Sequence, residues 1–393
     1  MGTKPLEVIP YAKHEVTNAD IAAVTKVLRT GRLTSGPVVE ELEDALTRVS
    51  GAKYAVACSS GTSALRLAAL AVAKGMGSRH FTVSVPNLTF CATAYVWSGL
   101  ANRMYLAEPD GDTGLALPGS PEGAVVVAVD YAGLLADYHT LKFHSRGSPI
   151  IADSSHALGA VSEDGLPIGK LADLATFSFH PAKHVTGGEG GAVVTNNKEH
   201  AELMRRLRNH GITSTEQDRA ESRGFEYDVA GQGGFNYRMS EVSAALTLSQ
   251  LRRLDVNLVR RLLIAGMYQD AFSGRSPSDM APLHDVKLRG HAWHLYVVTF
   301  KSKQLRDHVF KELWKQGIRC AVHYPPISSL RWAWENRTWV RATDSSHGSA
   351  MDFYSKVLSL PMYPSLTEGQ QERVIRAVRA SLRTAGTGAP GPR

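Results

Sequence analysis

Between residues 54 and 195 the sequence alternates short apolar runs with segments of helical period, and this order constrains the fold more than any other feature. Several of the runs contain no alternating polar residues, which predicts strands that are covered on both faces. Strands that alternate with helices in this way favour an α/β domain with a mostly parallel sheet. We expect seven strands, at residues 54–58, 81–85, 104–107, 124–129, 150–153, 175–179 and 192–195.

The segments around this core are predicted to be helical at first and mixed towards the C-terminus. The sequence from Thr17 to Asp20 is typical of a helix N-cap, and Gly31 would end that helix. Further helices are expected at residues 38–49, 62–73, 92–99, 199–209, 240–254, 256–272, 303–316 and 367–382, with strands at 295–300 and 318–322. The chain therefore divides into a large domain at 1–250 that includes the N-terminal segment, a small α+β domain at 251–383, and a tail at 384–393. This tail is rich in glycine and proline and is expected to be disordered.

The composition argues against several classes of protein. No apolar run approaches the roughly 18 residues that a membrane span requires. The N-terminus lacks the apolar core of a secretory signal, so we expect a cytoplasmic protein. The net charge of +7 is spread among 37 acidic residues without a basic arm, which argues against nucleic-acid binding and suits an anionic small substrate. Cys58, Cys91 and Cys320 are odd in number and far apart, and they predict reduced thiols instead of a disulfide framework or a metal site.

Residues 150–195 carry most of the chemistry. Asp153 ends an apolar run and Lys183 follows the next one, and open α/β sheets place ligand-binding groups at the carboxyl ends of their strands. A Schiff base with pyridoxal phosphate requires a lysine, and the pyridine nitrogen requires a carboxylate to stay protonated. Either residue alone is commonplace, since a strand-end aspartate usually caps a turn or a helix and a lysine usually lies in solvent. Together they fit both roles.

A phosphate site is predicted at residues 59–63, with the sequence SSGTS. This turn follows the run YAVAC and precedes a helix, where backbone N–H groups and hydroxyls can bind a phosphate. By itself such a turn is more often a simple helix cap. Glycines at 187, 188, 190 and 191 let the backbone turn tightly after Lys183.

At this point the sequence resembles the DegT/DnrJ/EryC1/StrS family of pyridoxal-phosphate-dependent sugar aminotransferases, which have fold type I. The resemblance covers nearly the whole chain in eight ordered blocks. They are GRLTSGP, SSGTSAL, PNLTFCATA, ADSSHALGA, ATFSFHPAKHVTGGEGG, FNYRMSEVSAAL, VHYPPI and SLPMYPSLT.

The resemblance implies a pyridoxal 5'-phosphate enzyme in which Lys183 forms the Schiff base and moves protons between the substrate carbon and C4′ of the cofactor. It implies that Asp153 pairs with the pyridine nitrogen and that Phe90 stacks on the ring face. His156 would lie near the other face of the ring or its phenolic oxygen. Lys183, Asp153 and His156 are thus the expected catalytic residues.

The resemblance also implies ligands for the phosphate and for the substrate. Gly61, Thr62 and Ser178 would bind the phosphate, joined by Asn236 from a neighbouring subunit, so that a homodimer shares the active site. The residues that match positions lining the sugar pocket are Thr34, Ser35, His323 and Tyr324.

Two departures bear on the reaction. Related sugar dehydratases carry histidine in place of the cofactor-binding lysine, whereas here Lys183 is present and His184 follows it, which favours transamination over dehydration. Many members have asparagine before the glycine of SSGTSAL, and Ser60 can replace it as a polar group.

The segment VDYAG at 129–133, together with DSSHALGA, is most similar to members that act at C4 of UDP-linked 4-keto-6-deoxy sugars and so form UDP-4-amino-4,6-dideoxy sugars. We expect L-glutamate as the amino donor. The alternatives are an aminotransferase for a dTDP-keto sugar or a keto-cyclitol, a sugar dehydratase that uses the same cofactor, and a non-enzymatic regulator that binds it. The intact set of Lys183, Asp153 and Ser178 argues against the regulator, because a protein that only binds the cofactor need not keep proton-transfer chemistry.

Overall fold

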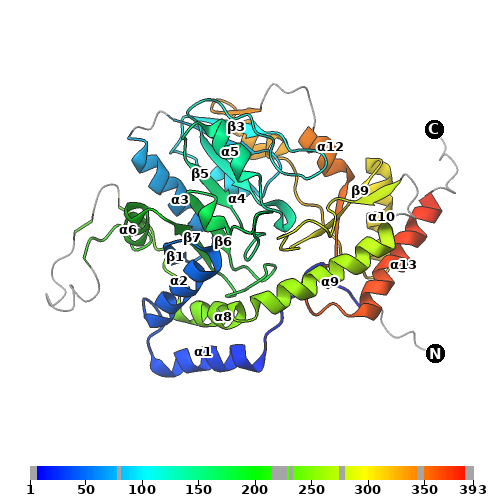
Figure 1. Cartoon of the computed structure of the whole chain (residues 1–393), viewed down its shortest axis with the longest axis horizontal. Coiled ribbons are helices and arrows are strands. Elements are labelled where there is room, and N and C mark those ends of the chain that lie inside the picture. The colour runs from blue at the N-terminus through cyan, green and yellow to red at the C-terminus, as the bar shows by residue number, and fades with distance from the viewer. Residues whose placement is uncertain are drawn as a thin grey trace.

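The computed structural model describes residues 7–77, 81–214, 228–229, 233–273, 279–342 and 349–385. A large body built around one sheet and a smaller body built around another are joined by the long helix α9 (Leu254–Phe272) (Figure 1). Among the described residues the large sheet has eight strands, in the order β1-β7-β6-β5-β4-β2-β3-β10. Their bounds are β1 (Tyr54–Cys58), β2 (Thr82–Pro86), β3 (Arg103–Ala107), β4 (Val125–Val129), β5 (Ile150–Asp153), β6 (Leu174–Ser178), β7 (Gly191–Thr195) and β10 (Val340–Ala342).

The large sheet is parallel throughout except at β7, which runs antiparallel to both β1 and β6. The predicted α/β fold with a mostly parallel sheet is confirmed. Strand β10 is one strand more than the seven expected, because it returns from the C-terminal third of the chain and pairs with β3, where Val340 lies opposite Met104.

Successive residues of the strands enter two different hydrophobic cores. In β1, Ala55 and Ala57 face one core, whereas Val56 and Cys58 face the other. Because side chains alternate across a strand, a strand with a core on each face is apolar at every position. The continuous apolar runs of the sequence have this cause.

Helices cover both faces of the large sheet. The first core is closed by α2 (Pro37–Ser50), α5 (Tyr138–Ser145) and α8 (Glu241–Leu251), and the second by α3 (Gly61–Gly75), α4 (Cys91–Tyr95) and α6 (Lys198–Leu207). Helix α1 (Asn18–Thr30) lies against α8 (Figure 1). It begins at the expected cap, where the Thr17 hydroxyl and the Asp20 carboxylate satisfy each other's backbone N–H groups, and it ends at Gly31 with φ 70°.

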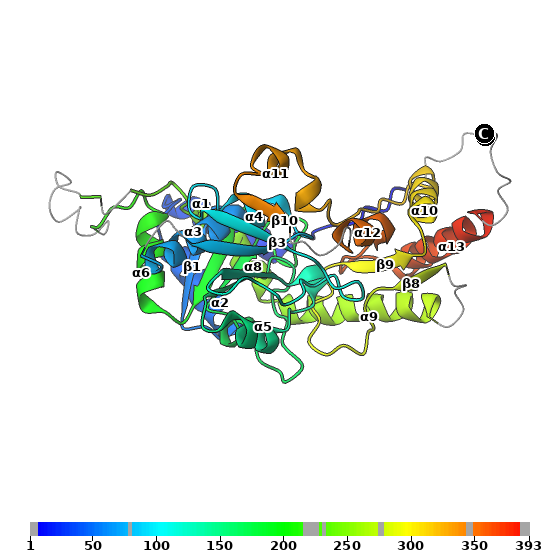
Figure 2. The ribbon, with the colours of Figure 1, turned by 90° about the horizontal axis from the view of Figure 1, so that it is seen from above.

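The small body contains a three-stranded antiparallel sheet in the order β11-β9-β8. These strands are β8 (Met280–Pro282), β9 (Tyr296–Phe300) and β11 (Val357–Leu360). Helices α9, α10 (Lys303–Lys315) and α13 (Glu368–Ala385) supply the apolar side chains of its core, and α12 (Ser349–Lys356) lies beside them (Figure 2). The short helix α11 (Arg331–Glu335) lies instead with β10 on the large sheet (Figure 2).

The prediction of a strand at 318–322 is wrong. This segment makes only isolated bridges, from Ile318 to Ile9 and from Ala321 to Ser359. It leaves the small sheet after one pair because the next residues turn towards the large body, and the two prolines that follow Tyr324 offer no N–H for a ladder.

The expected tail at 384–393 begins too early, because α13 continues to Ala385, and residues 386–393 lie outside the described part of the chain.

The division into domains at residue 250 stays a proposal. Two segments cross it: Ile9 packs in the core of the small body, and β10 belongs to the large sheet. In the part of the chain that the structure describes, no helix combines the length and apolarity needed to cross a membrane.

Candidate active site

A cavity of about 310 Å³ lies where the parallel strands of the large sheet end. Residues that follow β1, β2, β5 and β6 line it from the large body, and segments of the small body close it. The structure brings nine of the twelve predicted site residues together here. They are Gly61, Thr62, Phe90, Asp153, His156, Ser178, Lys183, His323 and Tyr324.

Lys183 stands in the turn after β6, where its backbone N–H donates to the carbonyl of His180 at 2.9 Å. Burial of its side chain in the cavity lowers the pKa of the amine to about 8, and the attraction of Asp153 offsets part of this effect. A lysine with such a pKa is partly neutral near neutral pH. Its nitrogen can therefore attack an aldehyde or accept a proton.

Asp153 is the last residue of β5, and hydrogen bonds from its surroundings fix its carboxylate. Oδ2 accepts from the Thr93 hydroxyl at 2.7 Å, Thr93 accepts in turn from the Thr89 hydroxyl at 2.9 Å, and Oδ1 accepts from the Ser155 hydroxyl at 2.6 Å. Sequence reasoning missed these three residues. The available signal was the block PNLTFCATA, which contains both threonines and starts at the end of β2, at the carboxyl edge of the sheet.

Four rings line the cavity, those of Phe90, Tyr324, His156 and His294. Phe90 keeps 54% of its surface exposed, and its ring is 5.9 Å from that of Tyr324. The Tyr324 hydroxyl lies 2.9 Å from Nε2 of His156, whose imidazole lies 4.3 Å from that of His294 at an angle of 30°. Burial is the main cause that lowers the pKa of both histidines well below the usual range, so both imidazoles are neutral near pH 7. His294 was not predicted, since it comes from the segment before β9 and no motif marks it.

The turn before α3 forms a cup for an anion. Ser60 caps the helix by accepting from the N–H of Ser63 at 3.1 Å, which leaves the N–H groups of Gly61 and Thr62 ahead of the first helical hydrogen bond. A Cβ atom at residue 61 would lie 2.7 Å from Cβ of Ser178, so only glycine allows this approach. Two backbone donors, the hydroxyls of Thr62 and Ser178, and the positive end of a helix dipole suit a phosphate.

The donor set as a whole fits pyridoxal phosphate. The cavity offers an amine for the aldehyde, a fixed carboxylate for the ring nitrogen, an open aromatic face for the ring, and a cup for the phosphate.

Thr34, Ser35 and Asn236 do not line the cavity of their own chain. Thr34 forms an isolated bridge with Ser240, the residue that directly precedes α8. Asn236 lies in the same segment before α8 and forms an isolated bridge with Asn209. Thr34 and Asn236 are exposed, and their expected roles stay a prediction.

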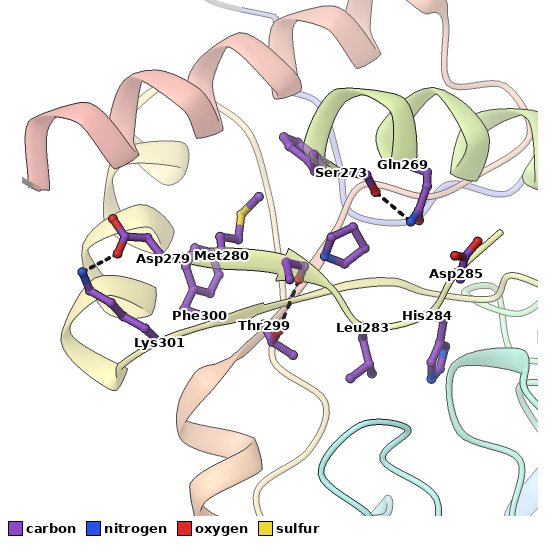
Figure 3. A pocket seen from close by; sticks show the side chains of 13 residues that line it. Gln269, Ser273, Asp279, Met280, Leu283, His284, Asp285, Thr299, Phe300 and Lys301 are labelled. Atoms are coloured by element: carbon purple, nitrogen blue, oxygen red, sulfur yellow. Dashed lines mark hydrogen bonds and ion pairs between the residues drawn. The ribbon is translucent and has the colours of Figure 1, made fainter. Parts of the chain in front are cut away.

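A larger hollow of about 690 Å³ lies on the small body between the end of α9 and strands β8 and β9 (Figure 3). Two pairs of its polar side chains bind each other, Lys301 with Asp279 and Gln269 with Ser273 (Figure 3). None of the predicted residues lines it. Its size therefore does not make it the reactive site.

Comparisons with known proteins agree with this site. Residues 14–379 match the model of the DegT/DnrJ/EryC1/StrS aminotransferase family. Helicobacter pylori PseC, an aminotransferase involved in the biosynthesis of pseudoaminic acid, superposes with a TM-score of 0.86 at 28% identity, covering 96% of this chain and 100% of PseC. The PLP-form of the putative sugar aminotransferase Spr1654 from Streptococcus pneumoniae gives 0.84 at 26% identity, covering 96% of this chain and 99% of that one.

A third similar structure is DesV from S. venezuelae in complex with a ketimine intermediate, with a TM-score of 0.79 at 29% identity and coverage of 92% of this chain and 93% of DesV. The match to the family model spans far more than half of the chain, and the similar structures include forms with the cofactor. The chain therefore belongs to the DegT/DnrJ/EryC1/StrS aminotransferase family and is a pyridoxal-phosphate-dependent aminotransferase.

Proposed function

We propose that this enzyme transfers an amino group from L-glutamate to C4 of a UDP-linked 4-keto-6-deoxy sugar. The observation that carries the proposal is the shared cavity of the Lys183 amine, the Asp153 carboxylate and the glycine cup before α3. The sugar as acceptor is supported by the similar structures, which include a putative sugar aminotransferase and one of pseudoaminic acid biosynthesis. The UDP group and the C4 position rest on the VDYAG and DSSHALGA segments.

The residues of the cavity divide the work of holding the cofactor. Gly61, Thr62 and Ser178 would bind the phosphate, Asp153 would hold the proton on the ring nitrogen, and Phe90 would cover one face of the ring. When bound, pyridoxal phosphate supplies an electron sink that stabilises the carbanion left by the departing proton. The hydroxyls of Thr93 and Ser155 keep the Asp153 carboxylate from turning away.

Proton transfer is assigned to Nζ of Lys183. Its lowered pKa of about 8 lets the nitrogen accept a proton from the amino donor's carbon and return one in the opposite half of the cycle. The neutral imidazole of His156, held by Tyr324, adds no charge beside the ring and covers it from water. Together these residues favour proton transfer by Nζ of Lys183 over exchange of the proton with solvent.

We further propose that the enzyme is a cytoplasmic homodimer with shared sites. Thr34, Ser35 and Asn236 would reach the cavity of the neighbouring subunit, where Asn236 would meet the phosphate. His323 and Tyr324 would meet the sugar from the same chain. The three cysteines are unpaired, which suits a reducing compartment.

The test is an assay of the purified enzyme with L-glutamate and one acceptor at a time: a UDP-4-keto-6-deoxy sugar, a dTDP-keto sugar or a keto-cyclitol. Continued formation of 2-oxoglutarate, beyond the single equivalent per site that glutamate releases without an acceptor, is expected only with the first acceptor, and preference for either of the others would overturn the assignment of the substrate. Lys183→Ala should lose both the visible absorption of the Schiff base and turnover, whereas Lys142→Ala, at an exposed position, should keep both. Full activity in Lys183→Ala would refute the proposed chemistry.

A further inference from the structure

Tyr131 connects the large body to the wall of the cavity that the small body provides. It opens the short helix η1 (Tyr131–Gly133) directly after β4, within the VDYAG segment, and its side chain is completely buried. Its hydroxyl donates to the backbone carbonyl of His323 at 2.8 Å. We propose that Tyr131 is a positioning residue that holds Tyr324, and through it His156, in place against the cofactor. This inference rests on the proposed function of the cavity.

The segment that carries His323 has few other ties where it enters the cavity. On the side of the small body, Ala321 exchanges backbone hydrogen bonds with Ser359, and Nδ1 of His323 lies 2.8 Å from the Ser359 hydroxyl. The two residues after Tyr324 are prolines, which offer no N–H group. On the side of the large body the backbone is next held at Ile327, whose N–H donates to the Asn87 carbonyl at 2.8 Å. The Tyr131 hydroxyl therefore bridges the two bodies at the residue that precedes Tyr324.

Tyr324 touches both rings that are expected to enclose the cofactor. Its hydroxyl lies 2.9 Å from Nε2 of His156, and its ring meets that of Phe90 at 5.9 Å and 61°. A shift of the backbone at His323 would move the Tyr324 hydroxyl, and the hydrogen bond to His156 would weaken because it depends steeply on distance and angle. The effect of Tyr131 on the cavity would thus act through Tyr324.

The ring of Tyr131 has a separate, structural role. It packs edge-on against Phe353 at 5.9 Å and 76°, and a Cβ atom at Gly114 would meet it at 2.8 Å. Phenylalanine at 131 would keep this packing and remove only the donor. Tyr131→Phe is therefore the variant that isolates the tie to His323.

The chain offers a matched control in Tyr268, on α9. Tyr268 is also completely buried, and its hydroxyl also donates to a backbone carbonyl, that of Pro361, at 3.0 Å. It does not line the cavity. Tyr268→Phe should lose a comparable amount of stability, which denaturation followed by circular dichroism will measure for both variants, and should leave the cavity unchanged.

The decisive readouts are the imidazole NMR signal of His156 in the cofactor-free protein, identified by its loss in His156→Gln, and the Kd for pyridoxal phosphate. We expect Tyr131→Phe and Tyr324→Phe each to shift that signal. We expect Tyr131→Phe also to raise the Kd about tenfold, the effect of one lost hydrogen bond of about 1.4 kcal/mol. Adding Tyr131→Phe to Tyr324→Phe should have little further effect on either readout, because both act through one contact.

If Tyr131→Phe matches Tyr268→Phe in the His156 signal and in the Kd, the positioning role is refuted and Tyr131 serves packing alone. If the wild type binds no pyridoxal phosphate, the proposed function fails, and the His156 signal of the cofactor-free variants still decides whether Tyr131 positions Tyr324.

Discussion

Acid should destabilise the cofactor-free protein well before its carboxylates titrate, and His284 offers the clearest test. This histidine stands between β8 and β9 with 5% of its surface exposed. Its Nε2 lies 2.9 Å from the Thr113 carbonyl and must donate there, so its Nδ1 accepts from Nε2 of His291 at 2.9 Å. His291 then accepts from the backbone N–H of Trp293 at 2.8 Å. All four ring nitrogens of His284 and His291 thus make hydrogen bonds in the neutral form, and none is free to take a proton.

The sign and size of the effect follow from the pKa of His284. Burial lowers it from 6.5 to about 4 in the folded protein. A base with a lowered folded pKa is protonated more readily in the unfolded state, so folding is favoured above pH 6.5 and loses stability as the pH falls from 6.5 towards 4. A pH of 5 is about 1.5 units below the pKa of this imidazole in the unfolded protein. At about 1.4 kcal/mol per unit, protonation of the unfolded state therefore lowers the free energy of unfolding by about 2 kcal/mol.

The assay is urea denaturation of the cofactor-free protein at pH 7.5 and pH 5, followed by circular dichroism. His284→Gln will be less stable than the wild type at pH 7.5, but its loss between the two values should be smaller by about 2 kcal/mol, because glutamine cannot take up a proton. His139→Gln is the control, since that side chain is 69% exposed. Equal losses of stability between pH 7.5 and pH 5 in His284→Gln and the wild type would refute the reasoning that the buried, hydrogen-bonded His284 opposes protonation.

Two further predictions concern the cofactor site. Gly61→Ala should raise the Kd for pyridoxal phosphate by about tenfold to a hundredfold, because the new methyl group overlaps Ser178. Fluorescence titration will check this, with Gly111→Ala as a control where nothing lies within 4 Å, and equal affinities would contradict the assignment of the cup. Thr93→Val should lower kcat about tenfold by removing the hydroxyl that holds Asp153, whereas Thr93→Ser should retain most of it; a fully active valine variant would show that the hydroxyl is dispensable.

The sequence predicted those parts of the fold in which a local pattern and the final environment agree. Strands β1 and β5 match the expected ranges residue for residue, because each is buried on both faces and each bears an apolar side chain at almost every position. Strand β10 has three residues and was missed, since so short a strand shows no period. The segment 318–322 looked like a strand locally, but the backbone around Ala321 leaves the sheet to carry His323 to the cavity.

The residues of the site likewise fall into those that a local sequence pattern predicts and those that it does not. Asp153 and Lys183 could be found because Asp153 ends one apolar strand and Lys183 lies in the turn after another, and the edge of a parallel sheet gathers such residues whatever the rest of the chain does. Thr93, His294 and Tyr131 act through contacts between segments that are distant in sequence, and their local surroundings resemble ordinary core.

Of the residues that sequence reasoning missed, Thr89, Thr93 and Ser155 lie in the large body around Asp153, whereas His294 and Tyr131 lie at the junction of the two bodies. His294 follows Trp293, whose carbonyl accepts from the buried Arg261 of α9, and the N–H of Leu295 donates to the Ala132 carbonyl beside Tyr131. Arg261 also donates to the His294 carbonyl, at 3.3 Å, so one guanidinium fixes two neighbouring residues. Because each body folds around its own core, only the docked pair defines where these groups lie, and no single stretch of sequence contains that information.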